Sequence, residues 1–71
     1  MNYVWRAAFT PRQNQAIDLL LQGMKDKDIA AELGLNYMTV KTRFSLIYRR
    51  AGVKSRMELM ALANRFQGLS S

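Results

Sequence analysis

Apolar residues recur along the chain at intervals of three and four, the spacing that gathers them on one side of an α-helix. The first such stripe consists of Ala16, Ile17, Leu20 and Met24. Just before it, Thr10 can accept a hydrogen bond from a free backbone amide, and Pro11 suits the first helical position. Gln13 is placed to reach back to the capping residue. The pattern predicts a helix over about residues 11–22, ended by Gly23.

Two more apolar stripes lie on either side of a three-residue spacer that begins with Gly34. The stripe before the spacer consists of Ile29, Ala30 and Leu33, and the stripe after it of Val40, Phe44, Ile47 and Ala51. Asn36 can cap the later helix and Gly52 can end it. We therefore expect helices over about residues 26–33 and 37–51, and their short glycine-bearing connection matches the spacing of a helix-turn-helix.

A fourth helix is predicted after Ser55, which has the S-x-x-E spacing of a capping box with Glu58. Its core-facing stripe would consist of Leu59, Leu62, Ala63 and Phe66. Strand signals are nearly absent. The expected fold class is all-α, a compact four-helix domain over residues 9–66 that contains a helix-turn-helix.

The two ends of the chain differ in character. Residues 1–8 form an N-terminal extension that is too apolar to remain an unstructured segment exposed to solvent. We expect Trp5 and Phe9 to pack on the helical core as a lid. Contact with a partner is the alternative for this extension. Residues 67–71 have the small, polar composition of a frayed tail.

Composition excludes several classes of protein. A chain of 71 residues forms one domain at most and buries a lean core. It has no cysteine and no histidine, so neither a disulfide framework nor the usual zinc sites can be built, and we predict no metal and no cofactor. Few residues suited to acid–base or nucleophilic chemistry remain, and we predict that the protein is not an enzyme.

The apolar runs are too short for a membrane span or a secretory signal. The longest, residues 59–63, is far below the roughly 18 residues that would cross a bilayer. The first eight residues contain no apolar run of signal-peptide length. We therefore expect no membrane partner and a cytoplasmic location.

The charge is strongly positive and unevenly distributed. Eleven Lys and Arg against five Asp and Glu leave a formal net charge of +6. One window contains six basic residues and no acid: Lys41, Arg43, Arg49, Arg50, Lys54 and Arg56. Such polarisation favours a polyanionic partner, although a solvated basic face would have the same composition.

The helix over residues 37–51 should present a polar side opposite its apolar stripe. That side consists of Met38, Lys41, Thr42, Ser45 and Arg49. One helix fits the major groove of DNA, where Lys can donate to guanine and the hydroxyls of Thr and Ser can bond either edge of a base pair. We predict Lys41, Thr42 and Ser45 as base-contacting residues. The alternatives are an ordinary exposed lysine and two neutral surface residues.

Phosphate contacts are expected from helix starts and from flexible cations. The candidates are Thr10, Arg12, Lys27, Thr39, Arg49, Lys54, Ser55 and Arg56. Lys27 could instead pair with Asp28 or Glu32 on its own surface. Tyr48 could reach a phosphate through its hydroxyl, although packing at the edge of the core is the interpretation we favour.

The fourth helix has a second, partly apolar side besides its core stripe. Its residues are Met57, Met60, Ala61 and Asn64. A lone domain needs only one buried side, so we predict that these residues form a dimer interface.

Residues 9–63 together resemble the DNA-binding domain of LuxR-type (GerE-like) transcription regulators. The motifs that carry the resemblance are Thr10-Pro11, Gly23, Asp28-Ile29-Ala30, Leu33, Thr39-Val40-Lys41, Ile47, Gly52-Val53, Ser55-Arg56 and Glu58-Leu59. The resemblance implies a four-helix domain, recognition by the third helix, and pairing of two copies through the fourth helix on an inverted-repeat site. It also implies a nucleoid-associated location in a bacterial or phage-like setting. With no sensing domain in the sequence, we expect a stand-alone regulator, an excised fragment being the alternative.

Four positions depart from the family pattern. Gln13 replaces a glutamate, so an ion pair with a nearby cation is expected to be missing. Lys25 replaces a small capping residue, which leaves Asp26 as the expected substitute cap. Arg43 replaces histidine and joins the phosphate-contacting candidates. Ala51 replaces leucine, and we expect the lid residues to fill the space this leaves.

These observations predict sequence-specific binding of double-stranded DNA by a small transcription regulator. Its expected partners are DNA, a second copy bound through the fourth helix, and RNA polymerase as a further candidate. The alternative is an adaptor or antagonist that uses the basic surface to bind an acidic protein of the transcription machinery.

Overall fold

The computed structural model describes the backbone of residues 5–70 and the side chains of residues 5–65. A short 3-10 helix, η1 (Trp5–Ala8), precedes four α-helices, and this part of the chain contains no strand. The helices are α1 (Pro11–Leu21), α2 (Asp26–Leu33), α3 (Tyr37–Ala51) and α4 (Arg56–Ser70). The predicted all-α class and helix-turn-helix are confirmed.

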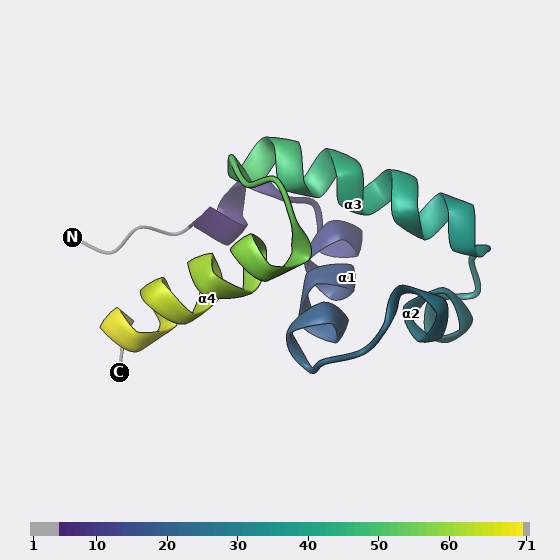
Figure 1. The fold of residues 1–71 in the computed structure, drawn as a ribbon, viewed down its shortest axis with the longest axis horizontal. Helices are drawn as coiled ribbons and strands as arrows, with labels where there is room; N and C mark the ends of the chain where they lie inside the picture. Colours follow the sequence, from purple (N-terminus) through teal and green to yellow (C-terminus); the bar gives the residue numbers. More distant parts are fainter. Residues whose placement is uncertain (1–4, 71) are drawn as a thin grey trace.

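Figure 1 shows α3 crossing above α1, with α2 beneath one end of α3 and α4 running away from beneath the other end. Helix α3 contacts both α2 and α4, and α1 contacts α2. Because α3 is held by neighbours along one side only, its other side is left open to solvent.

The core consists of one apolar cluster to which every helix contributes. Its buried members are Trp5, Phe9, Ala16, Ile17, Leu20, Ile29, Ala30, Val40, Phe44, Ile47, Leu59 and Ala63. Burial of this apolar surface is the main term that stabilises so small a fold. Phe66 was also predicted to face the core, but its side chain lies outside the described residues.

Trp5 and Phe9 bring the start of the chain into this core. Their rings meet edge to face with centroids 6.0 Å apart. Nη1 of Arg50 donates a hydrogen bond to the carbonyl oxygen of Ala8 at 3.0 Å, which holds the segment before α1 beside the last turn of α3. Ala51, in that same turn, is half-buried against the cluster.

The ends of α1 and α3 follow from their sequence. Thr10 and Gln13 form the complete capping box: Gln13 N donates to Thr10 Oγ1 at 3.1 Å, and Thr10 N donates to Gln13 Oε1 at 2.9 Å. Asn36 Oδ1 caps α3 by accepting from Thr39 N at 2.8 Å. Gly34 and Gly52 adopt left-handed conformations, with φ of 68° and 77°, and end α2 and α3.

The start of α2 differs from the expectation. Its capping position is held by Lys25, which makes no side-chain capping hydrogen bond. Asp26 is already the first helical residue, and its carboxylate faces Arg56. The expectation that Asp26 substitutes as the cap is therefore wrong, because the helix begins at Asp26 itself and the carboxylate is engaged elsewhere.

The start of α4 also differs in one detail. Ser55 Oγ accepts from Glu58 N at 3.2 Å, as a capping box requires, but Glu58 Oε1 accepts from Lys54 N at 3.3 Å and not from Ser55. At its other end α4 continues to Ser70 and includes residues 67–70, whose fraying stays a prediction. No helix within residues 5–70 has the length and apolar character needed to cross a membrane.

Candidate nucleic-acid interface

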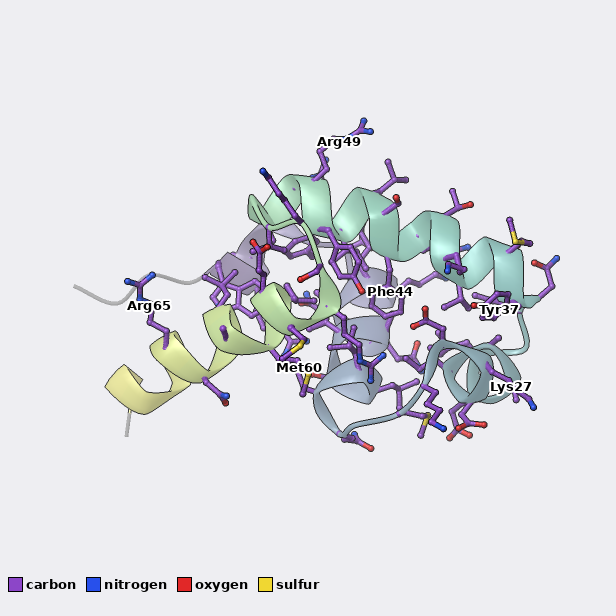
Figure 2. All side chains as sticks on the ribbon, in the orientation of Figure 1. Lys27, Tyr37, Phe44, Arg49, Met60 and Arg65 are labelled. Atoms are coloured by element: carbon purple, nitrogen blue, oxygen red, sulfur yellow. The ribbon has the colours of Figure 1, made fainter. Side chains whose placement is uncertain are left out.

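The outer side of α3 carries the three predicted base-contacting residues. Lys41, Thr42 and Ser45 are all exposed, while Val40, Phe44 and Ile47 of the same helix are buried. Figure 2 shows Phe44 pointing into the core and Arg49 pointing away from it. The structure thus brings Lys41, Thr42 and Ser45 together on one open face, with their side chains accessible to a ligand.

Lys41 is oriented by an aromatic neighbour. Its Nζ lies 5.4 Å from the centre of the Tyr37 ring, a cation–π arrangement, and Tyr37 itself is about half exposed. Such a contact restrains a lysine that would otherwise sample many rotamers. The sequence contains the i, i+4 spacing that allows this contact, although the pair was not predicted.

Two large apolar side chains also lie on the open side of α3. Met38 is 67% exposed and Leu46 is 51% exposed. With Thr42 between them, they stand at spacings of four, which places the three side chains in one row along the helix. Leu46 was absent from the predicted polar face, and its four-residue spacing from Thr42 was the signal that could have identified it.

Three of the phosphate candidates at helix starts already take part in helix-capping hydrogen bonds. The hydroxyl oxygens of Thr10 and Ser55 accept backbone amide protons, and the amide of Thr39 donates to Asn36. The two hydroxyl groups can still donate their own protons to an anion, whereas the Thr39 amide is occupied.

Four cationic candidates are exposed: Arg12, Lys27, Arg49 and Lys54. In Figure 2, Arg49 extends from the open side of α3 and Lys27 extends outward from α2. Among residues 5–65 no ion pair joins Lys27 to Asp28 or Glu32, the alternative considered from the sequence. Charge on these side chains is therefore available to a polyanion at several points around the domain.

Arg43 lies at the boundary between the body and the open face. It is half-buried, and its Nε is buried without a hydrogen-bond partner among the described residues. Together with Arg12, Gln13 and Glu32 it lines a pocket of ≈ 320 Å³ between α1, α2 and α3. The Arg43 side chain therefore lies in the pocket beside α1, whereas the Lys41 side chain is exposed on the open face.

Arg56, a phosphate-contacting candidate, is held in place by contacts within the fold. Its Nη2 donates to the carbonyl oxygen of Met24, and its Nη1 lies 3.5 Å from Oδ1 of Asp26. These contacts tie the first residue of α4 to the α1–α2 connection. Sequence spacing could not show this, because thirty residues separate Arg56 from Asp26.

Tyr48 packs at the edge of the core, which confirms the favoured interpretation. Its ring stacks on Phe44 with centroids 5.9 Å apart. Burial raises the pKa of the Tyr48 phenol; the carboxylate of Asp26 raises it further, while Arg56 opposes the rise. The hydroxyl therefore stays protonated and can donate a hydrogen bond, but it is not placed on the open face.

The four residues predicted at a dimer interface are not equivalent. Met57, Ala61 and Asn64 are exposed, and Met57, at 79%, is the most exposed large apolar side chain among residues 5–65. Met60 is half-buried and packs against the core, and Figure 2 shows it on the side of α4 that faces the body. The open part of this surface thus consists of Met57, Ala61 and Asn64.

Comparison with known proteins places these features in a family. The family model described as bacterial regulatory proteins, luxR family, matches residues 7–63. The chain is 38% identical over 55 residues to the response regulator Rre1 of Synechocystis, a match that covers 78% of this chain and 24% of that protein. It is 42% identical over 50 residues to the transcriptional regulatory protein UhpA of Escherichia coli, covering 70% of this chain and 26% of UhpA.

A third relative is the transcriptional regulatory protein YdfI of Bacillus subtilis, 35% identical over 54 residues, covering 76% of this chain and 25% of YdfI. The chain thus spans about a quarter of the length of the curated relatives named here. No solved structure matches it significantly.

Proposed function

The chain belongs to the luxR family of bacterial regulatory proteins, and we propose that it regulates transcription by binding double-stranded DNA with α3 in the major groove. The observation that carries this proposal is the open face of α3, where Lys41, Thr42 and Ser45 stand exposed on a helix fixed to α2 by the Gly34 turn. The relatives' names, which describe regulators, support the same function. Acting on DNA would place the protein in the bacterial cytoplasm, with RNA polymerase as a further candidate partner.

In this proposal the three exposed residues read base edges. The Lys41 ammonium would donate to the O6 and N7 acceptors of guanine, and the hydroxyls of Thr42 and Ser45 would bond whichever edge they face. The Tyr37 ring holds Lys41 near the N-terminal end of α3, the part of a recognition helix that meets base edges.

Phosphate contacts would lie around the three base-contacting residues. The proposed residues are Thr10, Arg12, Lys27, Thr39, Arg43, Arg49, Lys54, Ser55 and Arg56. The exposed cations Arg12, Lys27, Arg49 and Lys54 can reach a phosphate as they stand. Arg43 and Arg56 would have to turn outward, and Arg56 would give up its contacts with Met24 and Asp26.

Two copies would bind together through α4. The exposed side chains of Met57, Ala61 and Asn64, with Met60 at their edge, offer a partly apolar surface that a twofold axis could pair with itself. Two recognition helices related by that axis would face an inverted-repeat site about one turn of DNA apart.

Selection of bound sites from random double-stranded DNA tests the proposal. We expect enriched sites to form an inverted repeat, and we expect the affinity for the best site to fall with salt at a log–log slope near −0.9 per phosphate neutralised. A matched variant, Arg49→Ala, should lower the slope by about one. If the protein binds no DNA even at low salt, the proposal is wrong, and an adaptor that binds an acidic protein becomes the better explanation.

Sedimentation across protein concentration, with and without the selected site, tests pairing separately. A complex of two chains on DNA is expected, and Met57→Glu should reduce it by placing like charges on both sides of the axis. A single chain on an inverted repeat at every concentration would contradict the α4 interface.

A further inference from the structure

Met38 and Leu46 are unusual within the open face of α3. They are the only two large apolar side chains within residues 38–50 of that helix that exceed half exposure, at 67% and 51%. Both interrupt a surface that is otherwise polar or basic, beside Lys41, Thr42 and Ser45. Neither belongs to the core cluster or to the side chains packed against it. Their contribution to the fold is therefore small, and their exposure needs another explanation.

We propose that Met38 and Leu46 recognise the 5-methyl groups of two thymines in the major groove, which makes both of them specificity-determining residues. Thymine is the base that presents a methyl group there, and apolar side chains contact it directly. The inference rests on the proposed function, because it requires α3 to lie in the groove.

The geometry of α3 sets the separation of the two thymines. Eight residues separate Met38 from Leu46, which corresponds to about 12 Å along a helix that rises about 1.5 Å per residue. A helix in the major groove is inclined to the DNA axis and advances about one base pair for every three to four residues, so the two methyl contacts should lie roughly two to three base pairs apart within one half-site. Thr42, midway in the same row, would face the base pairs between them.

The surroundings favour DNA over a protein as the occupant of this row. Lys41 and Arg49 flank it with positive charge, and no acidic residue occurs anywhere in α3. The two side chains are separated by Thr42, so they form two isolated apolar points and not one continuous patch of the kind that marks a protein interface. Isolated methyl contacts at a fixed spacing suit the edges of successive base pairs.

Replacing thymine by deoxyuridine removes the methyl group and leaves base pairing intact. In the best site from the random selection, each thymine is replaced in turn, and affinity is measured by fluorescence anisotropy. Loss of one buried methyl group should weaken binding about three- to fivefold. We expect such a loss at two positions about two to three base pairs apart in each half-site.

Variants assign each position to a side chain. Met38→Ala should abolish the sensitivity at one position and Leu46→Ala at the other, while Gln22→Ala, a change at an exposed residue after α1, should leave both sensitivities unchanged. Urea unfolding of each variant checks that the fold is retained. As a second measurement, random selection repeated with Met38→Ser and Leu46→Ser combined should yield sites in which thymine no longer dominates these two positions.

The outcomes separate the inference from the proposed function. Tight, sequence-selective binding that is indifferent to every thymine replacement, or equal losses in the wild type and both alanine variants, overturns the inference and leaves DNA binding intact. In that case an apolar protein partner becomes the alternative for the row. Absence of any DNA binding overturns the proposed function and the inference together.

Discussion

Arg6 and Asp18 form an ion pair with Nη2 and Oδ1 2.7 Å apart, which fastens the segment before α1 to the middle of that helix. The same guanidinium donates from Nε to Oδ1 of Asn14 at 3.0 Å and from Nη2 to the Asn14 carbonyl oxygen at 2.7 Å. In return, the side-chain amide of Asn14 donates a hydrogen bond to the carbonyl oxygen of Arg6 at 3.2 Å. Among the described residues the Arg6 guanidinium thus has several partners, whereas the Asp18 carboxylate has one.

We predict unequal effects when the two partners are changed. Arg6→Ala should lower the free energy of unfolding by about 1–3 kcal/mol, because Oδ1 and the carbonyl oxygen of Asn14 both lose the guanidinium as a donor. Asp18→Asn should cost less than about 1 kcal/mol, because the Asp18 side chain is 57% exposed and that of Arg6 31% exposed, so water screens the pair. Urea unfolding followed by Trp5 fluorescence measures both. Arg12→Ala, a charge-matched change at an exposed site, is the control, and equal effects of Arg6→Ala and Arg12→Ala would contradict this account.

Arg56 is predicted to stabilise the fold in the absence of DNA. Arg56→Ala should lower the free energy of unfolding by about 1–3 kcal/mol, since the Met24 carbonyl and the Asp26 carboxylate both lose their donor. Lys54→Ala, two residues earlier and exposed, should change it by no more than about 0.5 kcal/mol. The comparison is made by urea unfolding without DNA. Equal stability of the two variants would mean that Arg56 is free for phosphate contact.

Much of this fold could be predicted because its determinants are local. The Thr10–Gln13 capping box, the Asn36 cap and the apolar stripe of α3 all involve residues within about one to three helical turns. A three-residue connection beginning with Gly34 leaves little choice for how α2 and α3 join. The helix-turn-helix follows from these signals together.

The contacts that sequence reasoning missed are long-range or depend on rotamers. Arg56 meets Asp26, and Arg50 meets Ala8, across separations that no periodicity encodes. The exposure of Leu46 depends on how far α3 is rotated against its neighbours, and an apolar residue is assigned to a core by default. The half-buried position of Met60 within the predicted α4 interface has the same origin.

Gly52 is predicted to be required for its backbone conformation and not for space. Its φ is 77°, and an added Cβ would meet no atom within 4 Å. Gly52→Ala should therefore lower the free energy of unfolding by about 1–2 kcal/mol, the strain of a left-handed residue, and Gly52→Asn should cost less because asparagine tolerates that conformation. Urea unfolding of the two variants provides the test. Equal losses for alanine and asparagine would point to a cause other than backbone strain.

Tyr48 is predicted to make the fold sensitive to alkaline pH. Its pKa is raised in the folded state by burial, then by Asp26, so the folded protein holds the phenol proton more tightly than the unfolded chain does. The stabilisation is therefore fully present below the ordinary tyrosine pKa of about 10 and is lost as the pH rises from there through the raised value. The free energy of unfolding should fall more steeply above pH 10 in the wild type than in Tyr48→Phe. Parallel curves for the two proteins, measured by urea unfolding at successive pH values, would show that Tyr48 does not contribute.

Lys41 and Lys54 carry the same charge, but Lys41 is proposed to contact a base and Lys54 a phosphate. We predict that removing Lys41 lowers sequence specificity and that removing Lys54 lowers affinity for all DNA. Lys41 stands on the open face of α3 beside the Tyr37 ring, whereas Lys54 is exposed in the connection before α4. Lys41→Ala should reduce the discrimination between the best site and a site changed at one guanine by about 1–3 kcal/mol, because a base-edge hydrogen bond is lost. Lys54→Ala should weaken both sites by the same factor and lower the salt slope by about one, because a phosphate contact is indifferent to sequence. Titrations of both variants on both sites at several salt concentrations provide the measurement, with the wild type as reference. If Lys41→Ala keeps the full discrimination while Lys54→Ala loses it, the reading face has been assigned to the wrong part of the domain.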